Sequence, residues 1–419
     1  MEKFTKFLEK YLEPVAEWIS NNRFLKSISN GMIMLMPFLL VTALFSIVQG
    51  VPAWLDFIPD WSEGVSNILL LPYNVTFGLI ALIISFTVAY NHAEKLKINP
   101  ATGGLISLVV FVILSAKYEN GAFDGTFLGS RGIFTAILVA LLVIELYKFL
   151  LKLNLKFKLP ESVAHTVQSS FEAIIPLAVI LVVFYGLSVL VQTTTGQMIP
   201  ALIQSAVAPA LKASDSALFW FVLGILMSVF FWMGMHGWAV MSGVWLAATI
   251  AFTSANAEAA AAGQPMPYIS GGTIWLCGQL HWHVPLMLML FCKSERNKAI
   301  GKATLIPGIF ALSEPYTFGV PVAFNPILAI PYIFAGPIAN VLNFYAVKWG
   351  LMNRSANLIQ ILAPAPLQGF LGTNGDWRVF PIFLVLLAVE VVIWYPFLKV
   401  WDNKCLREEK EAVASAKTK

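Results

Sequence analysis

Glu314 is the residue of this chain whose chemistry is hardest to explain as packing. It lies in ALSEPYTFGVPVAFNP, residues 311–326, which is otherwise as apolar as a membrane span. No lysine or arginine lies between 303 and 347 to neutralise the acid locally. An ionisable side chain at membrane depth is costly and by default indicates function; a carboxylate near the membrane surface is the alternative. Three prolines in the segment prevent a regular helix, which frees backbone groups for a polar ligand.

His236 is the second candidate for chemistry. It lies in SVFFWMGMHGWAV, residues 228–240, between Gly234 and Gly237, and glycine allows a backbone or a ligand to approach closely. Imidazole can donate and accept hydrogen bonds. The aromatic residues beside it, Trp238 among them, are typical either of a membrane-interface belt or of surfaces on which a sugar ring stacks. A histidine at the cytoplasmic end of a span is the alternative interpretation.

A third group of polar residues follows an apolar run in LGTNGDW, residues 371–377. This segment concentrates Asn374, Asp376 and Trp377 around an Asn-Gly pair. Asn-Gly is a turn signal, so an ordinary tight turn at the outer surface is one interpretation. The other is the tip of a hairpin that supplies hydrogen bonds to a polyol.

Other candidates for chemistry are weaker. The histidines of HWH, residues 281–283, stand at i and i+2, which do not share a helical face, and no third ligand has a suitable spacing. We therefore interpret them as structural or interfacial. The cysteines form no CxxC pair, so we predict neither a disulfide framework nor a metal site for Cys277, Cys292 and Cys405. Packing or placement near a span end is the interpretation for Glu145, Glu172 and Glu390.

The elements that must hold these residues are membrane spans. Of 419 residues, 58% are hydrophobic and 12% are charged, and mean hydropathy is +0.75. A soluble domain carries about 25% charged residues, so this composition indicates an all-α protein that crosses the membrane many times. Nothing in it suggests binding to nucleic acid. About ten runs are long and apolar enough to span: 29–50, 71–91, 101–117, 132–152, 171–192, 216–236, 237–258, 271–292, 327–346 and 379–399.

The lysines and arginines orient these spans. They concentrate in alternate segments, namely residues 1–28, 148–158, 293–302 and the 402–419 tail. The segment 51–70 between the first two spans has neither. By the positive-inside rule both termini are cytoplasmic. The mixed-charge segment 1–28 has no signal-peptide core, so we expect it to be retained as an amphipathic cytoplasmic segment.

Two apolar segments, 304–326 and 356–377, are interrupted by prolines, glycines and polar residues. Broken helix at membrane depth is tolerated only where protein buries it or where it lines a cavity, so we predict two re-entrant hairpins. The first five spans are more regular. We therefore expect a scaffold at 29–192, a linker at 193–215, and a substrate-binding part at 216–401. An amphipathic surface helix is predicted near 160–172.

Four of these segments, in this order, resemble the membrane C component of the bacterial phosphotransferase system, in its lactose/cellobiose/N,N'-diacetylchitobiose family. They are KLPESVAHTVQSSFEAIIP (158–176), the MHG around His236, SEPYTFGVPVAFNP, and TNGDW. The resemblance covers nearly the whole chain. It departs at Ser313, where the family commonly has asparagine before the acid-proline pair, and serine keeps a hydroxyl but loses an amide.

The resemblance implies a homodimer in the bacterial cell membrane, with the scaffold at the dimer contact and the later part moving across the membrane as an elevator. A cellobiose- or diacetylchitobiose-like disaccharide would be phosphorylated on its 6-hydroxyl by the phosphocysteine of a separate B component, which is charged by an A component. No cofactor is implied. Glu314 and His236 would act at the reacting end of the sugar. The further sugar contacts would be Ser313, Gly237, Trp238, Asn325, Asn374, Asp376 and Trp377.

Two other classes of protein fit the same residues. An ion-coupled sugar symporter would also place Glu314 and His236 in a site at mid-membrane, but it would release unmodified sugar. A structural or regulatory membrane protein would bind no sugar.

Overall fold

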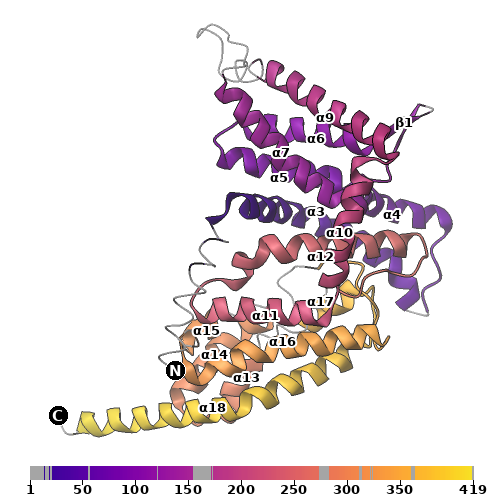
Figure 1. Cartoon of the computed structure of the whole chain (residues 1–419). Helices are drawn as coiled ribbons and strands as arrows, with labels where there is room; N and C mark the ends of the chain where they lie inside the picture. The colour runs from indigo at the N-terminus through magenta and orange to yellow at the C-terminus, as the bar shows by residue number, and fades with distance from the viewer. Residues whose placement is uncertain are drawn as a thin grey trace. The chain divides into compact units, whose positions relative to one another are not determined.

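A computed structural model gives the fold, which is mostly helical (Figure 1). It describes residues 21–54, 57–119, 121–153, 173–272, 283–310, 314–320, 322, 324–359 and 364–417, with the single residues 14, 18 and 171. Almost all of the predicted surface helix near 160–172 and most of residues 1–20 lie outside the described residues.

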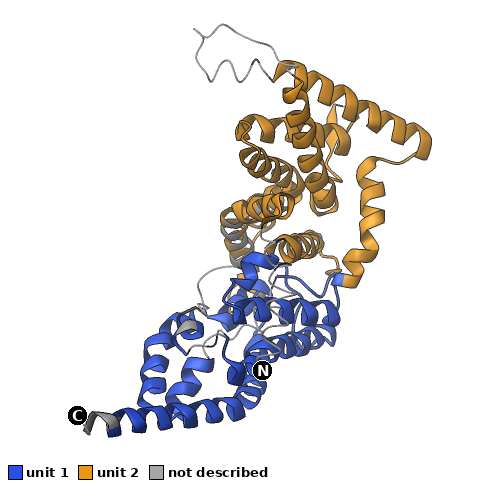
Figure 2. Ribbon diagram, turned by 60° about the vertical axis from the view of Figure 1, so that its left-hand side comes forward, with its two compact units in different colours: residues 1–20, 214–241, 268–419 blue, residues 21–213, 242–267 orange. Residues whose placement is uncertain are grey.

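The chain divides into two compact units (Figure 2). Unit 1 comprises Met1–Ser20, Ser214–Met241 and Tyr268–Lys419, and unit 2 comprises Asn21–Ala213 and Ser242–Pro267. Helix α12 (Gly237–Ala261) begins in unit 1 and ends in unit 2. The sequence suggested one division near 193–215, whereas the chain passes between the units again within α12 and after Pro267.

Unit 2 is built around helix α5 (Ile80–Lys95), which packs against α3 (Arg23–Trp54), α6 (Pro100–Ser115) and α7 (Ile133–Lys152). Its remaining elements are α4 (Glu63–Gly78), the antiparallel strands β1 (Lys117–Glu119) and β2 (Ala122–Asp124), the 3₁₀ turn Ser130–Gly132, α9 (Ile174–Thr195) and α10 (Ile199–Ser214).

Buried polar pairs fix these helices to one another. The hydroxyls of Ser85 on α5 and Ser107 on α6 lie 2.8 Å apart. The imidazole of His92 on α5 lies 3.0 Å from Ser27 Oγ on α3 and 3.0 Å from Glu145 Oε1 on α7. Because a buried polar group is costly unless it is paired, these contacts select one register for the packed helices.

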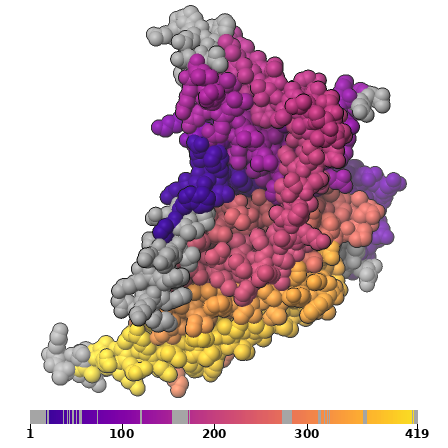
Figure 3. Space-filling model, in the orientation of Figure 1, coloured from indigo at the N-terminus to yellow at the C-terminus, as the bar shows by residue number. Residues whose placement is uncertain are grey.

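Unit 1 contains α11 (Ala217–Trp232), α13 (His283–Phe291), α14 (Glu295–Ile309), α15 (Glu314–Gly319), α16 (Pro326–Lys348), α17 (Ala365–Gly372) and α18 (Val379–Lys417). Helix α16 packs against both α11 and α18, and α13 packs against α14. Gly224 of α11 permits a close approach of α16, because a Cβ there would stand 3.1 Å from the ring of Pro337. In the space-filling view α18, in yellow, lies open along the surface of this unit (Figure 3).

Five helices in the described part of the chain are long and apolar enough to cross a membrane, or six if α10 and α11 form one span. The five are Ser130–Lys152, Ile174–Thr195, Gly237–Ala261, Pro326–Lys348 and Val379–Ala412. The expected span 71–91 is interrupted at Leu79, between α4 and α5. Helix α6 has only 16 residues, fewer than the roughly 20 that a straight span needs. The number of ten spans therefore stays a prediction.

Both segments expected to be irregular consist of short helices separated by breaks. In 304–326, α14 ends at Ile309, α15 covers six residues, and α16 begins at Pro326. In 356–377, α17 ends at Gly372 and a turn follows, in which Asn374 and Gly375 have φ angles of 56° and 85°. These left-handed angles suit Asn-Gly.

Candidate functional site

The loop that carries His236 is built by the end of α11. After Trp232 the chain turns at Gly234, where φ is 81°, and Met235 N donates to Phe230 O at 2.9 Å. This is the usual glycine-dependent end of a helix. His236 Nδ1 then accepts a hydrogen bond from Ala239 N at 3.2 Å, so His236 caps the start of α12. In the neutral ring this acceptor role places the proton on Nε2, which makes Nε2 a donor.

The two residues that follow His236 differ in how the fold uses them. Gly237 is buried, and a Cβ there would stand 2.0 Å from the backbone oxygen of Met227. Close packing of α12 on α11 therefore requires a glycine, independently of any ligand. Trp238 is half-buried, while the His236 ring is exposed and lies 4.8 Å from the ring of Phe231.

The His236 loop pairs with the segment that follows α15. Phe324 N donates to Trp232 O at 2.9 Å, and Trp232 Nε1 donates to Asn325 O at 3.1 Å. The rings of Trp232 and Phe324 lie 5.7 Å apart. Phe324 has a φ of 54°, a strained angle for a bulky residue, and these contacts hold it there. Two regions about ninety residues apart in the sequence are thereby brought together.

Asn325 has a structural use in this segment. Its Oδ1 accepts hydrogen bonds from Ile327 N at 3.0 Å and Leu328 N at 3.4 Å, so it caps α16. Pro326 occupies the first turn of α16, where its missing N–H costs nothing. The Asn-Pro pair is therefore explained by the start of the helix, and any contact of Asn325 with sugar would come from its remaining groups.

Glu314 opens helix α15. Ser313 and the side chain of Glu314 lie outside the described residues. This segment is anchored by Tyr316 of α15 and by Val320 and Val322, which follow α15. All three belong to one buried core that also includes Trp232 and Met233. The structure therefore brings the segment that Glu314 opens and the His236 loop onto a single core.

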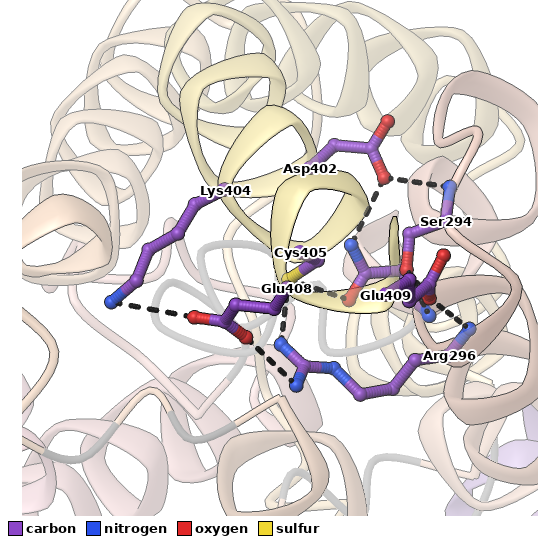
Figure 4. Close-up of polar contacts among 8 residues, drawn as sticks. Ser294, Arg296, Asp402, Lys404, Cys405, Glu408 and Glu409 are labelled. Atoms are coloured by element: carbon purple, nitrogen blue, oxygen red, sulfur yellow. Dashed lines mark hydrogen bonds and ion pairs between the residues drawn. The ribbon is translucent and has the colours of Figure 1, made fainter. Parts of the chain in front are cut away.

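Helix α14, which leads toward Glu314, is fixed at its start by carboxylates of α18 (Figure 4). Asp402 accepts hydrogen bonds from Lys293 N at 2.7 Å and Ser294 N at 3.1 Å, and Glu409 accepts from Arg296 N at 3.0 Å. Acids at a helix N-terminus satisfy its free amides and complement its dipole. Nothing in the local sequence indicated this contact, since the partners lie more than a hundred residues apart.

The turn 371–377 is tied to the chain just before α17. Asn374 Oδ1 accepts from Asn357 Nδ2 at 2.5 Å, and Ser355 Oγ donates to Gly372 O at 3.0 Å. Trp377 is 61% exposed and stacks loosely on Phe370 and Phe380. The amide oxygen of Asn374 is thus already used by the fold, while the indole of Trp377 is open.

Asp376 is also occupied by the fold. Its carboxylate accepts two hydrogen bonds from the Arg378 guanidinium, at 2.9 and 3.0 Å, and one from Asn353 N at 2.6 Å. Burial alone would raise the pKa of Asp376, but the hydrogen bonds from Arg378 and Asn353 outweigh it, and the pKa lies below its usual value. Arg378 lies only two residues after Asp376 in the sequence, yet we did not predict it as the partner of this carboxylate.

Among the described residues, no group of three His, Cys, Asp or Glu side chains could hold a metal ion. Cys292 and Cys405 are free and buried, and Cys277 lies outside those residues together with the first two residues of HWH. The third, His283, lies against Glu390.

Comparison with known proteins identifies the arrangement. Residues 29–336 match the family described as phosphotransferase system, EIIC. The chain is 33% identical to the lactose-specific EIICB component of Lactococcus lactis subsp. lactis, over 98% of this chain and 74% of that protein. It is 32% identical to the corresponding component of Streptococcus mutans, over 96% and 73%.

A solved structure is similar as well. The crystal structure of ChbC, the IIC component of the N,N'-diacetylchitobiose-specific phosphotransferase system, matches 96% of this chain and 99% of that one. The TM-score is 0.86 and the sequence identity is 29%. The family match, the relatives that align with nearly the whole of this chain, and the shared fold agree with one another and with the apolar helices. The chain therefore belongs to the EIIC family of membrane sugar-transport components of the phosphotransferase system.

Proposed function

We propose that the chain binds a β-linked disaccharide, carries it across the cell membrane, and presents its 6-hydroxyl to the phosphocysteine of a B component on another chain. The observation that carries the proposal is the pairing of Trp232 with Phe324 and Asn325. It joins the His236 loop to the segment that Glu314 opens, and a single sugar site requires these two segments to lie together. Membership in the EIIC family supplies the class of reaction.

The His236 loop would hold the reacting end of the sugar. Because Nδ1 of His236 accepts from Ala239, the neutral ring carries its proton on Nε2, and this N–H would donate to a sugar hydroxyl when sugar is bound. The neighbouring Trp238, together with Gly237 and the Asn325 side chain, would line the same end. Ser313 would add a hydroxyl beside the acid.

Glu314 would act on the hydroxyl itself. As the 6-oxygen forms its bond to phosphorus, the bond from phosphorus to the cysteine sulfur of the B component breaks, and the hydroxyl proton passes to the Glu314 carboxylate. Phosphoryl transfer depends mainly on positioning and on stabilising charge, so one base at the correct place suffices. Trp377 and the amide nitrogen of Asn374 would contact the distal ring, with Asp376 shaping their turn.

The disaccharide class follows from the relatives. One is lactose-specific and another belongs to a system specific for N,N'-diacetylchitobiose, and the chain is similar to both at 33% and 29% identity. We therefore extend the proposal to disaccharides of these types, including cellobiose. The Ser313 position is the first place to seek the preference, because it differs from the common asparagine beside the acid.

Assembly and topology are part of the proposal. Helix α9 is apolar, and only 17% of its span is buried within the chain. Large side chains such as Val182, Tyr185 and Leu190 are exposed on it, which supports a face for lipid or for a second copy in a homodimer. The two units support a scaffold and a moving part, and the lysine-rich segments support cytoplasmic termini.

The test uses sealed vesicles that contain the full chain. With phosphorylated B component inside and disaccharide outside, we expect sugar phosphate to accumulate inside; with unphosphorylated B component we expect none. Concentration of unmodified sugar driven by a proton gradient, with no phosphoryl donor present, would instead support an ion-coupled symporter. If the chain binds none of lactose, N,N'-diacetylchitobiose and cellobiose, the proposed sugar site is rejected.

A further inference from the structure

The strongest unassigned feature lies in unit 1, where His283 of α13 meets Glu390 of α18. His283 Nδ1 and Glu390 Oε2 are 3.0 Å apart, and the side chains are 7% and 1% exposed. Glu390 occupies the apolar part of a helix long enough to span a membrane. A buried imidazole–carboxylate pair in such a place is costly to keep, so by default it has a function rather than a packing role.

The pair adjoins the core that carries the candidate site. The His283 ring meets the ring of Trp394 edge-on at 5.7 Å, and Trp394 is nearly fully buried. Trp394 belongs to the same core as Trp232, which pairs with Phe324, and as Tyr316, which follows Glu314. Through Trp394 the pair is therefore in packed contact with the elements that hold both sugar-binding segments.

A second contact farther along α18 indicates how the pair helps to position α13. Ser294 N, eleven positions after His283, donates to Asp402, twelve positions after Glu390. Both contacts advance together along the chain, so α13 runs parallel to α18. His283 at the start of α13 meets Glu390, and the connection between α13 and α14 meets α18 about 18 Å farther along its axis. Figure 1 shows α13 beside α18, and Figure 4 shows the contacts at the Asp402 end.

The contact at the start of α13 and the contact just after its end together allow α13 only one register along α18. Apolar packing alone tolerates small slips, whereas the buried imidazole of His283 and carboxylate of Glu390 stay within ion-pair distance in only one register. Helix α13 continues into α14, and α14 leads toward Glu314. We propose that His283 and Glu390 form a positioning pair for the sugar site, fixing α13 on α18 and thereby the core that carries the His236 loop and the Glu314 segment.

The proposal rests on the function proposed above, and the experiment separates the two. Full-length chain in lipid nanodiscs is titrated with disaccharide by calorimetry, and phosphorylation of bound sugar by phosphorylated B component is followed in the same preparations. If wild-type chain binds no sugar, the proposed function fails, and the positioning role for a sugar site fails with it. If wild-type chain binds sugar and Glu390→Gln binds it equally well, the positioning role alone is overturned.

Glu390→Gln keeps the shape of the side chain and removes its charge. We expect sugar Kd to rise about tenfold, within the usual range for residues that act on a site through packing. At saturating sugar the phosphorylation rate should stay within about twofold of wild type, because the residue touches neither sugar nor phosphoryl group. A fall in that saturated rate with an unchanged Kd would contradict the proposal.

The matched control is Val110→Ala on α6 of unit 2, a fully buried aliphatic residue outside α13, α18 and the core that carries the proposed site. It should lower the unfolding temperature and leave sugar Kd unchanged. If Val110→Ala weakens sugar binding as much as Glu390→Gln does at equal loss of unfolding temperature, the pair acts only through general stability and the proposal falls.

The coupling of the two residues is measured with His283→Gln and the double variant. If the two residues act as one unit, the sugar Kd of the double variant should be no higher than that of the single variant that binds sugar less tightly. Losses that multiply would show two independent residues and overturn the pair. If Glu390→Gln does not fold, Glu390→Asp, which keeps the charge and is shorter by one methylene, decides the same comparisons, with an expected rise in Kd of about threefold.

Discussion

Two polar regions of unit 1 looked alike in sequence and differ in how far their polar side chains are exposed. In the turn 371–377, the Asp376 carboxylate is taken by Arg378 and Asn353, and the Asn374 oxygen is taken by Asn357. In the loop around His236, one ring nitrogen caps α12 and the ring itself remains exposed. A polar residue near a membrane span is therefore a candidate for ligand binding only after its structural hydrogen bonds have been counted.

The largest effect is expected at Glu314, in the segment paired with the His236 loop. Glu314→Gln keeps the shape and hydrogen-bonding capacity of the side chain but cannot accept a proton at neutral pH. Phosphorylation of bound sugar should fall about 10²-fold or more, the usual scale for loss of a general base, while sugar Kd changes only a few-fold. The measurement is calorimetric affinity beside a single-turnover rate. A variant that binds poorly yet phosphorylates its bound sugar at the normal rate would make the carboxylate a sugar ligand only.

His236→Ala tests the same region through binding. It removes both the cap of α12 and the proposed donor to sugar, so sugar affinity should fall by about 1–3 kcal/mol. His236→Asn is the matched control, because asparagine also caps helices well and restores the start of α12. Unfolding temperature should recover in His236→Asn while sugar affinity stays weak. Full recovery of affinity with the cap would show that the histidine only builds the loop.

Gly237→Ala tests whether the glycine after the histidine serves the ligand or the fold. The added Cβ would stand 2.0 Å from Met227 O, a backbone atom that cannot move aside cheaply. We expect a loss of about 1–3 kcal/mol in stability, the usual cost of overpacking. Gly186→Ala on α9 is the control, since its Cβ would meet nothing within 4 Å, and it should be neutral or slightly stabilising. Equal thermal stability of the two variants would reject this packing role.

The smallest effect on function is expected at Asp376. Its folded-state pKa is depressed, so the stability that it contributes is present at neutral pH and is lost as the pH falls through that depressed pKa. Asp376→Asn should lower stability by about 1–2 kcal/mol at neutral pH, a figure reduced because Arg378 is half exposed. Thermal unfolding of both proteins between about pH 7 and about pH 3 checks the sign. The difference between them should shrink in acid, and a constant difference would contradict the assignment.

The sequence was most informative where a residue conflicted with its surroundings. Glu314 in an apolar run, His236 between glycines, and the proline breaks of 304–326 each marked a segment that the structure places at helix ends. The family resemblance and the membrane class are confirmed by the comparisons. The break at Leu79 was not predicted, because the run 71–91 is long and apolar enough for one span, although Gly78 stands directly before the break.

Long-range polar partners could not be predicted. Asp402 and Glu409 read as parts of a charged tail, yet they bind the start of α14 from more than a hundred residues away. Glu390 read as a packing residue near a span end, yet it lies buried against His283. Local sequence carries periodicity and turn chemistry, whereas the partner of a buried charge is set by which helices meet.

The most direct test of the account is to compare sugar affinity in His236→Ala and Asp376→Asn, measured by calorimetry in the same nanodiscs with the same disaccharide. We expect an affinity loss of about 1–3 kcal/mol for His236→Ala. Asp376→Asn should stay within about twofold of wild type at a temperature where it is folded, because its carboxylate is already used by Arg378 and Asn353. An unchanged affinity in His236→Ala together with a large loss in Asp376→Asn would show that the Asp376 carboxylate, and not His236, holds the sugar, and would contradict the proposed site.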